Sequence, residues 1–95
     1  MLNNRKILVL SENDNIAVCL VDMEIGEVIG QDGLNLTIQN RIPGGHKVAT
    51  NAIAKDEGNI KYGERMGHAT SDIKIGEHVH THNVLGDRLS TEQVK

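Results

Sequence analysis

The sequence predicts an all-β domain, and three observations lead to this prediction. Short apolar runs alternate with polar turns, ten Gly residues punctuate these runs, and the aliphatic residues are mostly β-branched, with 10 Ile and 8 Val beside 8 Leu. No stretch shows a sustained helical period. At 95 residues the chain has the length of one domain, so we treat residues 1–95 as a single unit.

The first half of the chain contains three predicted strands. "KILVL" (6–10) and "NIAVCLV" (15–21) are short apolar runs separated by the polar turn "SEND". "LNLTIQNRI" (34–42) alternates, with aliphatic residues on one parity and polar residues on the other, which is typical of a half-buried strand. The aliphatic parity consists of Leu34, Leu36, Ile38 and Ile42, interrupted only by Asn40.

The second half is less uniform. "HKVATNAI" (46–53) fits either a strand or a helical turn, and "YGERMGHAT" (62–70) has room for one helical turn. "NIKYG" (59–63) and "HVHTHNV" (78–84) are predicted strands. Before them, Pro43 with two glycines predicts a turn.

One internal echo links two parts of the chain. "DMEIGEVI" (22–29) and "DIKIGEHV" (72–79) share Asp, an apolar residue, a charge, Ile-Gly-Glu and a final apolar residue. In each, the Gly can form a turn that leads into a strand. The echo fits a β fold with approximate internal symmetry, and it equally fits the use of a common turn sequence twice.

Composition excludes several classes of partner and compartment. The net charge of −3 and the scattered basic residues argue against nucleic acid as a partner. The lone Cys19 excludes an internal disulfide, and its apolar surroundings predict a buried, unreactive thiol. No N-terminal apolar run is long enough for a signal peptide or a membrane span, so we expect a cytoplasmic protein. With one Tyr and no Phe or Trp, the chain has few residues for a deep pocket, so we expect another chain to complete its working surface.

The densest group of candidate functional residues is "GEHVHTHN" (76–83), with His78, His80 and His82 at every second position. On a strand these three imidazoles would face one way and span about 13 Å, so at most two would share one metal ion. The run by itself fits a metal site, a pair of catalytic bases, or a row of solvated histidines.

A second candidate is "IPGGHK" (42–47), where His46 and Lys47 follow a flexible turn. A Lys can hold a carboxylate while a His exchanges a proton. Neighbouring residues on a strand point to opposite faces, so only one of the pair would face a given pocket unless both lie on the turn. Tyr62 fits either a core position or a hydrogen bond to a ligand, and Arg88 offers a planar donor fork for a carboxylate or lies solvated on the surface.

Taken in order, these motifs resemble the SAF-type domain of altronate and galactarate dehydratases. The matching residues are Asp14 and Asn15, Ile42 through Lys47, Lys61 through Gly63, Gly67, Gly76, Val79, His80, His82, Asn83 and Arg88. The resemblance extends from about residue 6 to residue 88. It implies a β-clip fold and a role in removing water from a sugar acid.

The resemblance also implies partners, a cofactor and site residues. A large catalytic dehydratase subunit would carry most of the site, with iron or another divalent cation, and this chain would contribute one wall and be inactive alone. In that wall His46, Lys47 and His82 would be catalytic, Tyr62, Asn83 and Arg88 would bind the substrate, and His80 and His82 would bind the metal. Arg41 and the segment "VLGD" (84–87) depart from the common pattern of the family, which leaves the identity of the acid open.

Three alternatives to a dehydratase small subunit follow from the same residues. One is the small subunit of a sulfolactate sulfo-lyase, a related enzyme that eliminates sulfite. The second is a sugar-acid or metal-binding module without catalysis, and the third is an adaptor that only stabilises a large partner. A homo-oligomer is compatible with each. Because no linker to a second domain follows Arg88, we expect a separate subunit.

Overall fold

The all-β prediction is confirmed. The computed structural model describes residues 5–11, 13–31, 33–55, 59–62 and 64–86, and within them all regular structure is β-strand, joined in antiparallel pairs. The strands are β1 (Ile7–Leu8), β2 (Ile16–Cys19), β3 (Val28–Gln31), β4 (Leu34–Thr37), β5 (Lys47–Ala49), β6 (Asn59–Tyr62), β7 (Glu64–Ala69), β8 (His78–Val79) and β9 (Val84–Gly86). No helix that could cross a bilayer occurs in these ranges.

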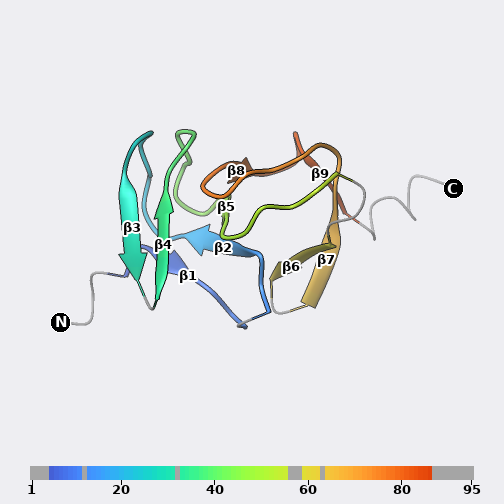
Figure 1. The fold of residues 1–95 in the computed structure, drawn as a ribbon, viewed down its shortest axis with the longest axis horizontal. Coiled ribbons are helices and arrows are strands. Elements are labelled where there is room, and N and C mark those ends of the chain that lie inside the picture. The colour runs from blue at the N-terminus through green and yellow to red at the C-terminus, as the bar shows by residue number, and fades with distance from the viewer. Residues whose placement is uncertain (1–4, 12, 32, 56–58, 63, 87–95) are drawn as a thin grey trace, which may run out of the picture.

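Three sheets form three layers (Figure 1). The central sheet has the order β1-β2-β5-β8, the β3–β4 hairpin lies at one end of the molecule, and the sheet β6-β7-β9 lies at the other. The strand β8 is therefore an edge of the central sheet, and its histidine, His78, lies at that edge.

Apolar side chains on both faces of the central sheet produce two cores. One face packs against the hairpin through a cluster that includes Ile7, Ala17, Cys19, Val48, Ile29 and Leu36. The other face packs against β6 and β7 through a cluster that includes Ile16, Ala49, Val79, Ile60 and Ala69. Burial on both faces explains why "IAVC" is continuously apolar instead of alternating.

The lone cysteine belongs to the first core, as predicted. Cys19 is fully buried, and burial, followed by the negative charge of Glu27, raises the pKa of its thiol to about 11. The thiol therefore stays protonated at neutral pH and is no nucleophile.

Two segments differ from the helical alternatives. Residues 46–53 form the short strand β5 followed by a bend, and residues 64–69 form β7, so neither contains a helical turn. Long-range pairing with β2 and β8, and with β6 and β9, satisfies the backbone groups that a helical turn would have satisfied locally.

The predicted strand over 34–42 is shorter than its pattern. The structure ends β4 at Thr37, yet the burial alternation continues to Ile42, with Leu36, Ile38 and Ile42 buried and the residues between them exposed or half-buried. Ile42 forms an isolated bridge with Met23.

The internal echo has the same structure in both copies. Gly26 and Gly76 both adopt a left-handed φ, of 91° and 88°. In each copy the Glu after that Gly caps the turn, with Oε1 of Glu27 accepting from Glu24 N at 3.0 Å and Oε1 of Glu77 accepting from Lys74 N at 2.8 Å.

The first residue of each copy, an Asp, also makes an equivalent hydrogen bond. Oδ1 of Asp22 accepts from the backbone N–H of Gly44, and Oδ1 of Asp72 accepts from that of Lys55. The offset between the contacted residues is the same in both kinds of contact. It runs from Gly44 to Lys55 for the Asp side chains, and from Ile42, the bridge partner of Met23, to Ile53, the bridge partner of Ile73. We conclude that the fold has approximate internal symmetry, with the histidines present in one copy only.

Candidate functional site

The turn after β8 decides where the histidines lie. Residues 78–84 were predicted to form one strand, and that prediction is wrong: β8 ends at Val79, a turn covers residues 80–83, and β9 begins at Val84 in a different sheet. The turn is closed by a hydrogen bond from Asn83 N to His80 O at 3.1 Å. His80 and His82 therefore lie outside the strand, and the turn, not strand alternation, decides where their side chains lie.

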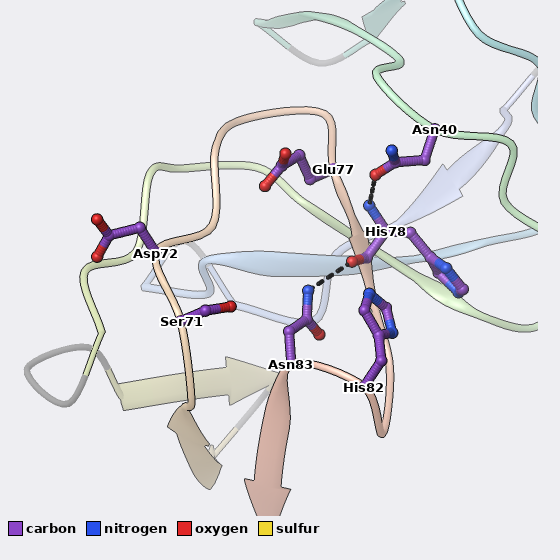
Figure 2. A pocket seen from close by; sticks show the side chains of 7 residues that line it. All are labelled: Asn40, Ser71, Asp72, Glu77, His78, His82 and Asn83. Carbon is purple, nitrogen blue, oxygen red and sulfur yellow. Dashed lines mark hydrogen bonds between the residues drawn. The ribbon is translucent and has the colours of Figure 1, made fainter.

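Asn83 holds this turn with its side chain (Figure 2). Its Oδ1 accepts from His80 N at 3.0 Å and its Nδ2 donates to His78 O at 2.8 Å. The residue is 7% exposed, so these bonds are shielded from water. Its predicted role in substrate binding stays a prediction, and its structural role is to position the histidine-bearing turn.

We expect Asn83→Ala to destabilise the protein by about 1–3 kcal/mol, because two partly buried backbone groups lose their partners. Urea unfolding monitored by far-UV circular dichroism measures this loss. Asn35→Ala, on the exposed face of β4, is the matched control and should change stability by less than about 0.5 kcal/mol. Equal stabilities for the two variants would contradict a clamping role for Asn83.

The register of the central sheet brings a third part of the chain to the histidines. Lys47 pairs with Val79 and Val48 with His78. One step further along this antiparallel register, His46 comes opposite His80. The rings of His46 and His80 stack with centroids 4.0 Å apart and an interplanar angle of 14°.

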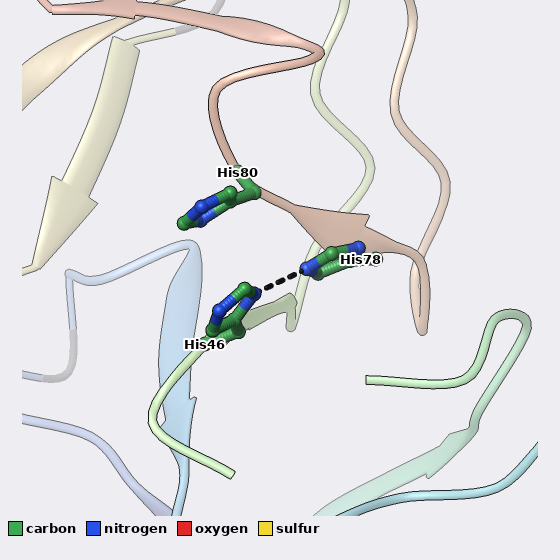
Figure 3. Close-up of side chains that lie close together, drawn as sticks. All are labelled: His46, His78 and His80. Atoms are coloured by element: carbon green, nitrogen blue, oxygen red, sulfur yellow. Dashed lines mark hydrogen bonds between the residues drawn. The ribbon is translucent and has the colours of Figure 1, made fainter. Parts of the chain in front are cut away.

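His78 joins this stack to form an imidazole cluster of His46, His78 and His80 (Figure 3). His46 Nδ1 lies 2.9 Å from His78 Nε2, so one of these nitrogens carries the proton that the other accepts. One ring nitrogen from each of the three residues lies within 4.8 Å of the others. The ring of His82 lies against that of His78, with centroids 5.0 Å apart.

The surroundings of His78 favour its neutral form. Partial burial, followed by repulsion from His82, His46 and His80, lowers the pKa of His78 below its ordinary value of 6.5. Neutral imidazole has a lone pair, so His78 is suited to accept a proton or bind a metal ion at neutral pH.

The same shift predicts acid sensitivity. Because the folded-state pKa of His78 lies below its unfolded value, the folded state binds fewer protons, and stability falls as pH drops from about 6.5 through that lower pKa. The urea midpoint should decrease between about pH 7.5 and about pH 5, and should decrease less in His78→Gln. Asn35→Gln, an exposed change on β4 that removes no ionisable group, is the control and should keep the wild-type dependence. Identical pH dependence in wild type and His78→Gln would refute this assignment.

The predicted pair of His46 and Lys47 is divided between the two faces of β5. His46 lies in the imidazole cluster, whereas Lys47 points the other way and its Nζ lies 5.9 Å from the ring centroid of Tyr62. Tyr62 itself packs against the second core. The roles of Lys47 and Tyr62 in catalysis and substrate binding stay predictions, and Arg88 lies outside the described residues.

The structure thus groups the predicted residues differently from the sequence pattern. It brings together His46, His80 and also His78, which is not among the residues matched to the family pattern. It places His82 beside His78. The pairing of His80 with His82 as metal ligands stays a prediction. The echo between residues 22–29 and 72–79 was the one sequence signal that could have indicated how His78 is placed.

Comparison with known proteins accounts for this arrangement of motifs. The family model of the altronate/galactarate dehydratase SAF domain matches residues 5–87. The chain belongs to this SAF-domain family. The predicted resemblance is therefore confirmed over most of the chain.

The SAF domain has relatives of two kinds. The altronate dehydratases of Bacillus subtilis and Escherichia coli are 35% and 43% identical over 79 and 82 residues, which is 83% and 86% of this chain. The chain spans only 16% and 17% of the length of these two enzymes. The (2R)-sulfolactate sulfo-lyase subunit alpha of Chromohalobacter salexigens is 39% identical over 83 residues, covering 80% of this chain and 88% of that subunit.

Proposed function

We propose that this SAF domain is the small, non-autonomous part of a sugar-acid dehydratase and contributes one wall of the active site to a large catalytic polypeptide. The observation that carries the proposal is the convergence of His46, His78 and His80 at one sheet edge. His46 and His80 belong to two motifs that match the family pattern, and His78 lies beside the second of them. The fold places His46 against the other two although 32 residues separate His46 from His78.

Two comparisons support a large partner. In the altronate dehydratases the matching region is a small fraction of a much longer chain, and in the sulfo-lyase it is most of a protein named as a subunit. Either arrangement supplies additional protein beside the SAF domain. A sugar acid needs hydrogen bonds on several sides, and a second wall would provide them.

The imidazole cluster fits a divalent metal ion, for which we propose iron. Adjacent ligands of a six-coordinate ion at about 2.1 Å stand about 3 Å apart, close to the 2.9 Å between His46 Nδ1 and His78 Nε2. Imidazole suits iron, zinc, copper and nickel alike. When bound, such an ion would act as a Lewis acid toward a carboxylate or hydroxyl oxygen of the substrate.

Side chains of this SAF domain would then bind the substrate and exchange protons with it. His82 is exposed, lies beside His78 and has no place in the cluster, so it is the free imidazole for general acid–base catalysis. Elimination of water needs a base that removes the proton next to the carboxylate and an acid that protonates the leaving hydroxyl. We assign one of these two steps to His82.

A second candidate is the small subunit of a sulfolactate sulfo-lyase. It is favoured by one observation, the 88% coverage of subunit alpha, which has nearly the size of this chain. The two functions share the proposed metal-binding wall and differ in the leaving group. An elimination assay with acids of both kinds therefore separates them.

An elimination assay tests the proposal. The tagged chain is purified with the large polypeptide that binds it, and the complex is supplied with altronate, galactarate and sulfolactate. We expect formation of a 2-keto-3-deoxy acid by the complex and no turnover by the isolated SAF domain. Absence of elimination from every acid would refute the function, and robust turnover by the isolated domain would refute the need for a partner.

Replacing His82 separates catalysis from a purely structural role. The complex with His82→Ala should assemble normally and lose about 100-fold or more in kcat, the range expected for removal of a general acid or base. An adaptor would keep full activity after this change.

A further inference from the structure

A polar hollow of about 270 Å³ lies beside the imidazole cluster (Figure 2). Ser71 and Asp72 reach it from the loop after β7, Glu77 from the turn before β8, and Asn40 from the segment after β4. His78 on β8, with His82 and Asn83 on the turn after it, completes the wall. None of the catalytic, substrate-binding or metal-binding roles proposed above involves Asn40, Ser71, Asp72 or Glu77.

The wall of the hollow offers hydrogen-bonding groups and negative charge. No Lys, Arg or aliphatic side chain is among the described residues that line it. One carboxylate oxygen of Asp72 and one of Glu77 accept backbone N–H groups, and Oδ1 of Asn40 accepts from His78 N at 2.9 Å. The second oxygen of each carboxylate, the amide nitrogen of Asn40 and the hydroxyl of Ser71 make no hydrogen bond in the described part of the chain.

This combination selects for hydroxyl groups and against anions. A hydroxyl group can donate to the free carboxylate oxygens and accept from the Asn40 amide. A carboxylate or sulfonate only accepts, and here it would face Asp72 and Glu77 with no Lys or Arg among the described residues that line the hollow. The hollow therefore suits the neutral, polyhydroxylated part of a ligand.

We propose that the hollow binds the hydroxyl-bearing tail of the substrate while its acid end lies at the imidazole cluster. The inference rests on the proposed function and narrows its substrate to a long-chain monoacid, in preference to a diacid or a sulfonate. At about 30 Å³ per water molecule the hollow holds the equivalent of roughly nine waters, more than three or four CHOH groups require. His78 lines the hollow and belongs to the cluster, so the two ends of one ligand can reach both.

Glu77→Gln tests the charge of the hollow with little change in structure. Gln keeps an Oε1 that can accept from Lys74 N, so the turn before β8 keeps its cap. The matched control is Glu27→Gln, which alters the same capping position in the other copy of the repeat, outside the hollow. The control also loses an exposed ion pair with Lys6, which contributes little to stability.

The measured quantity is the ratio of kcat/KM for galactarate to that for altronate, determined for the purified complex. We expect this ratio to rise roughly tenfold in Glu77→Gln and to stay at the wild-type value in Glu27→Gln. Ser71→Lys, which places a cation in the hollow, should raise the ratio further. An active complex whose ratio is unchanged in Glu77→Gln and Ser71→Lys would overturn the inference and leave the proposed function intact.

If the complex turns over none of the acids, a direct binding experiment tests whether the hollow binds the hydroxyl-bearing tail. The isolated ¹⁵N-labelled chain is titrated with altronate and, separately, with sulfolactate, and amide shifts are followed by NMR. Saturable shifts with altronate at the amides of Ser71, Glu77 and His82, stronger than with sulfolactate and weakened by Ser71→Lys, would support the subsite. Absence of such shifts, or equal shifts with both acids, would overturn it.

Discussion

Gly76→Ala is expected to destabilise this SAF domain by about 3 kcal/mol or more, a large part of the stability of a domain this small. A Cβ at position 76 would overlap the backbone oxygen of Thr37, which cannot move without displacing β4. The left-handed φ of 88° adds about 1–2 kcal/mol for a residue with a side chain. The same backbone carries two hydrogen bonds, from Gly76 N to Ala49 O and from Gln39 N to Gly76 O.

The internal symmetry supplies the control for this experiment. Gly26→Ala changes the equivalent glycine, which has nearly the same φ but nothing within 4 Å of its added Cβ, so it should cost only the conformational term of about 1–2 kcal/mol. Gly30→Ala has open space and ordinary φ and should be neutral or slightly stabilising. Urea unfolding measures all three. Equal losses for Gly76→Ala and Gly26→Ala would show that the backbone contact with Thr37 does not matter.

If the proposed metal ion binds at the imidazole cluster, Asn substitutions there should remove it from the proposed complex. With one ligand lost, we expect each of His46→Asn, His78→Asn and His80→Asn to lower metal affinity by about 100-fold or more, because loss of an outer-shell partner alone costs about 10–100-fold. Metal content after dialysis, measured by mass spectrometry, is the readout. Turnover should fall at least in proportion.

His82→Asn distinguishes the cluster from the ligand pair predicted by the sequence. If His46, His78 and His80 are the ligands, His82→Asn should keep its metal while losing activity, and His68→Asn should keep both. If metal loss occurs in His80→Asn and His82→Asn but not in His46→Asn, the predicted pair is correct and the cluster is not the site. Retention of metal in all of these variants would exclude any of these histidines as a ligand.

Local sequence patterns were sufficient for the all-β class and for several burial assignments. Continuous aliphatic runs such as "IAVC" indicated strands, alternation over residues 34–42 indicated which side chains are buried, and the apolar neighbours of Cys19 indicated a buried thiol. These features depend on residues adjacent in the chain, since strand periodicity and hydrophobic burial are expressed over a few positions. The order and spacing of whole motifs were likewise enough to identify the family.

The arrangement of the histidines depended on the tertiary structure. The alternation in "HVHTHN" indicated a strand through all three histidines, but the Asn83 side chain closes a turn after Val79, and this turn decides which rings His80 and His82 contact. The pairing of β5 with β8 brings His46 opposite His80 and sends Lys47 to the other face. The sequence alone therefore determined which residues are available for a site, and the tertiary structure decided which of them meet. The physical reason is that pairing between segments more than 30 residues apart is set by the packing of two cores and by backbone contacts such as that of Gly76 with β4, which no local pattern encodes.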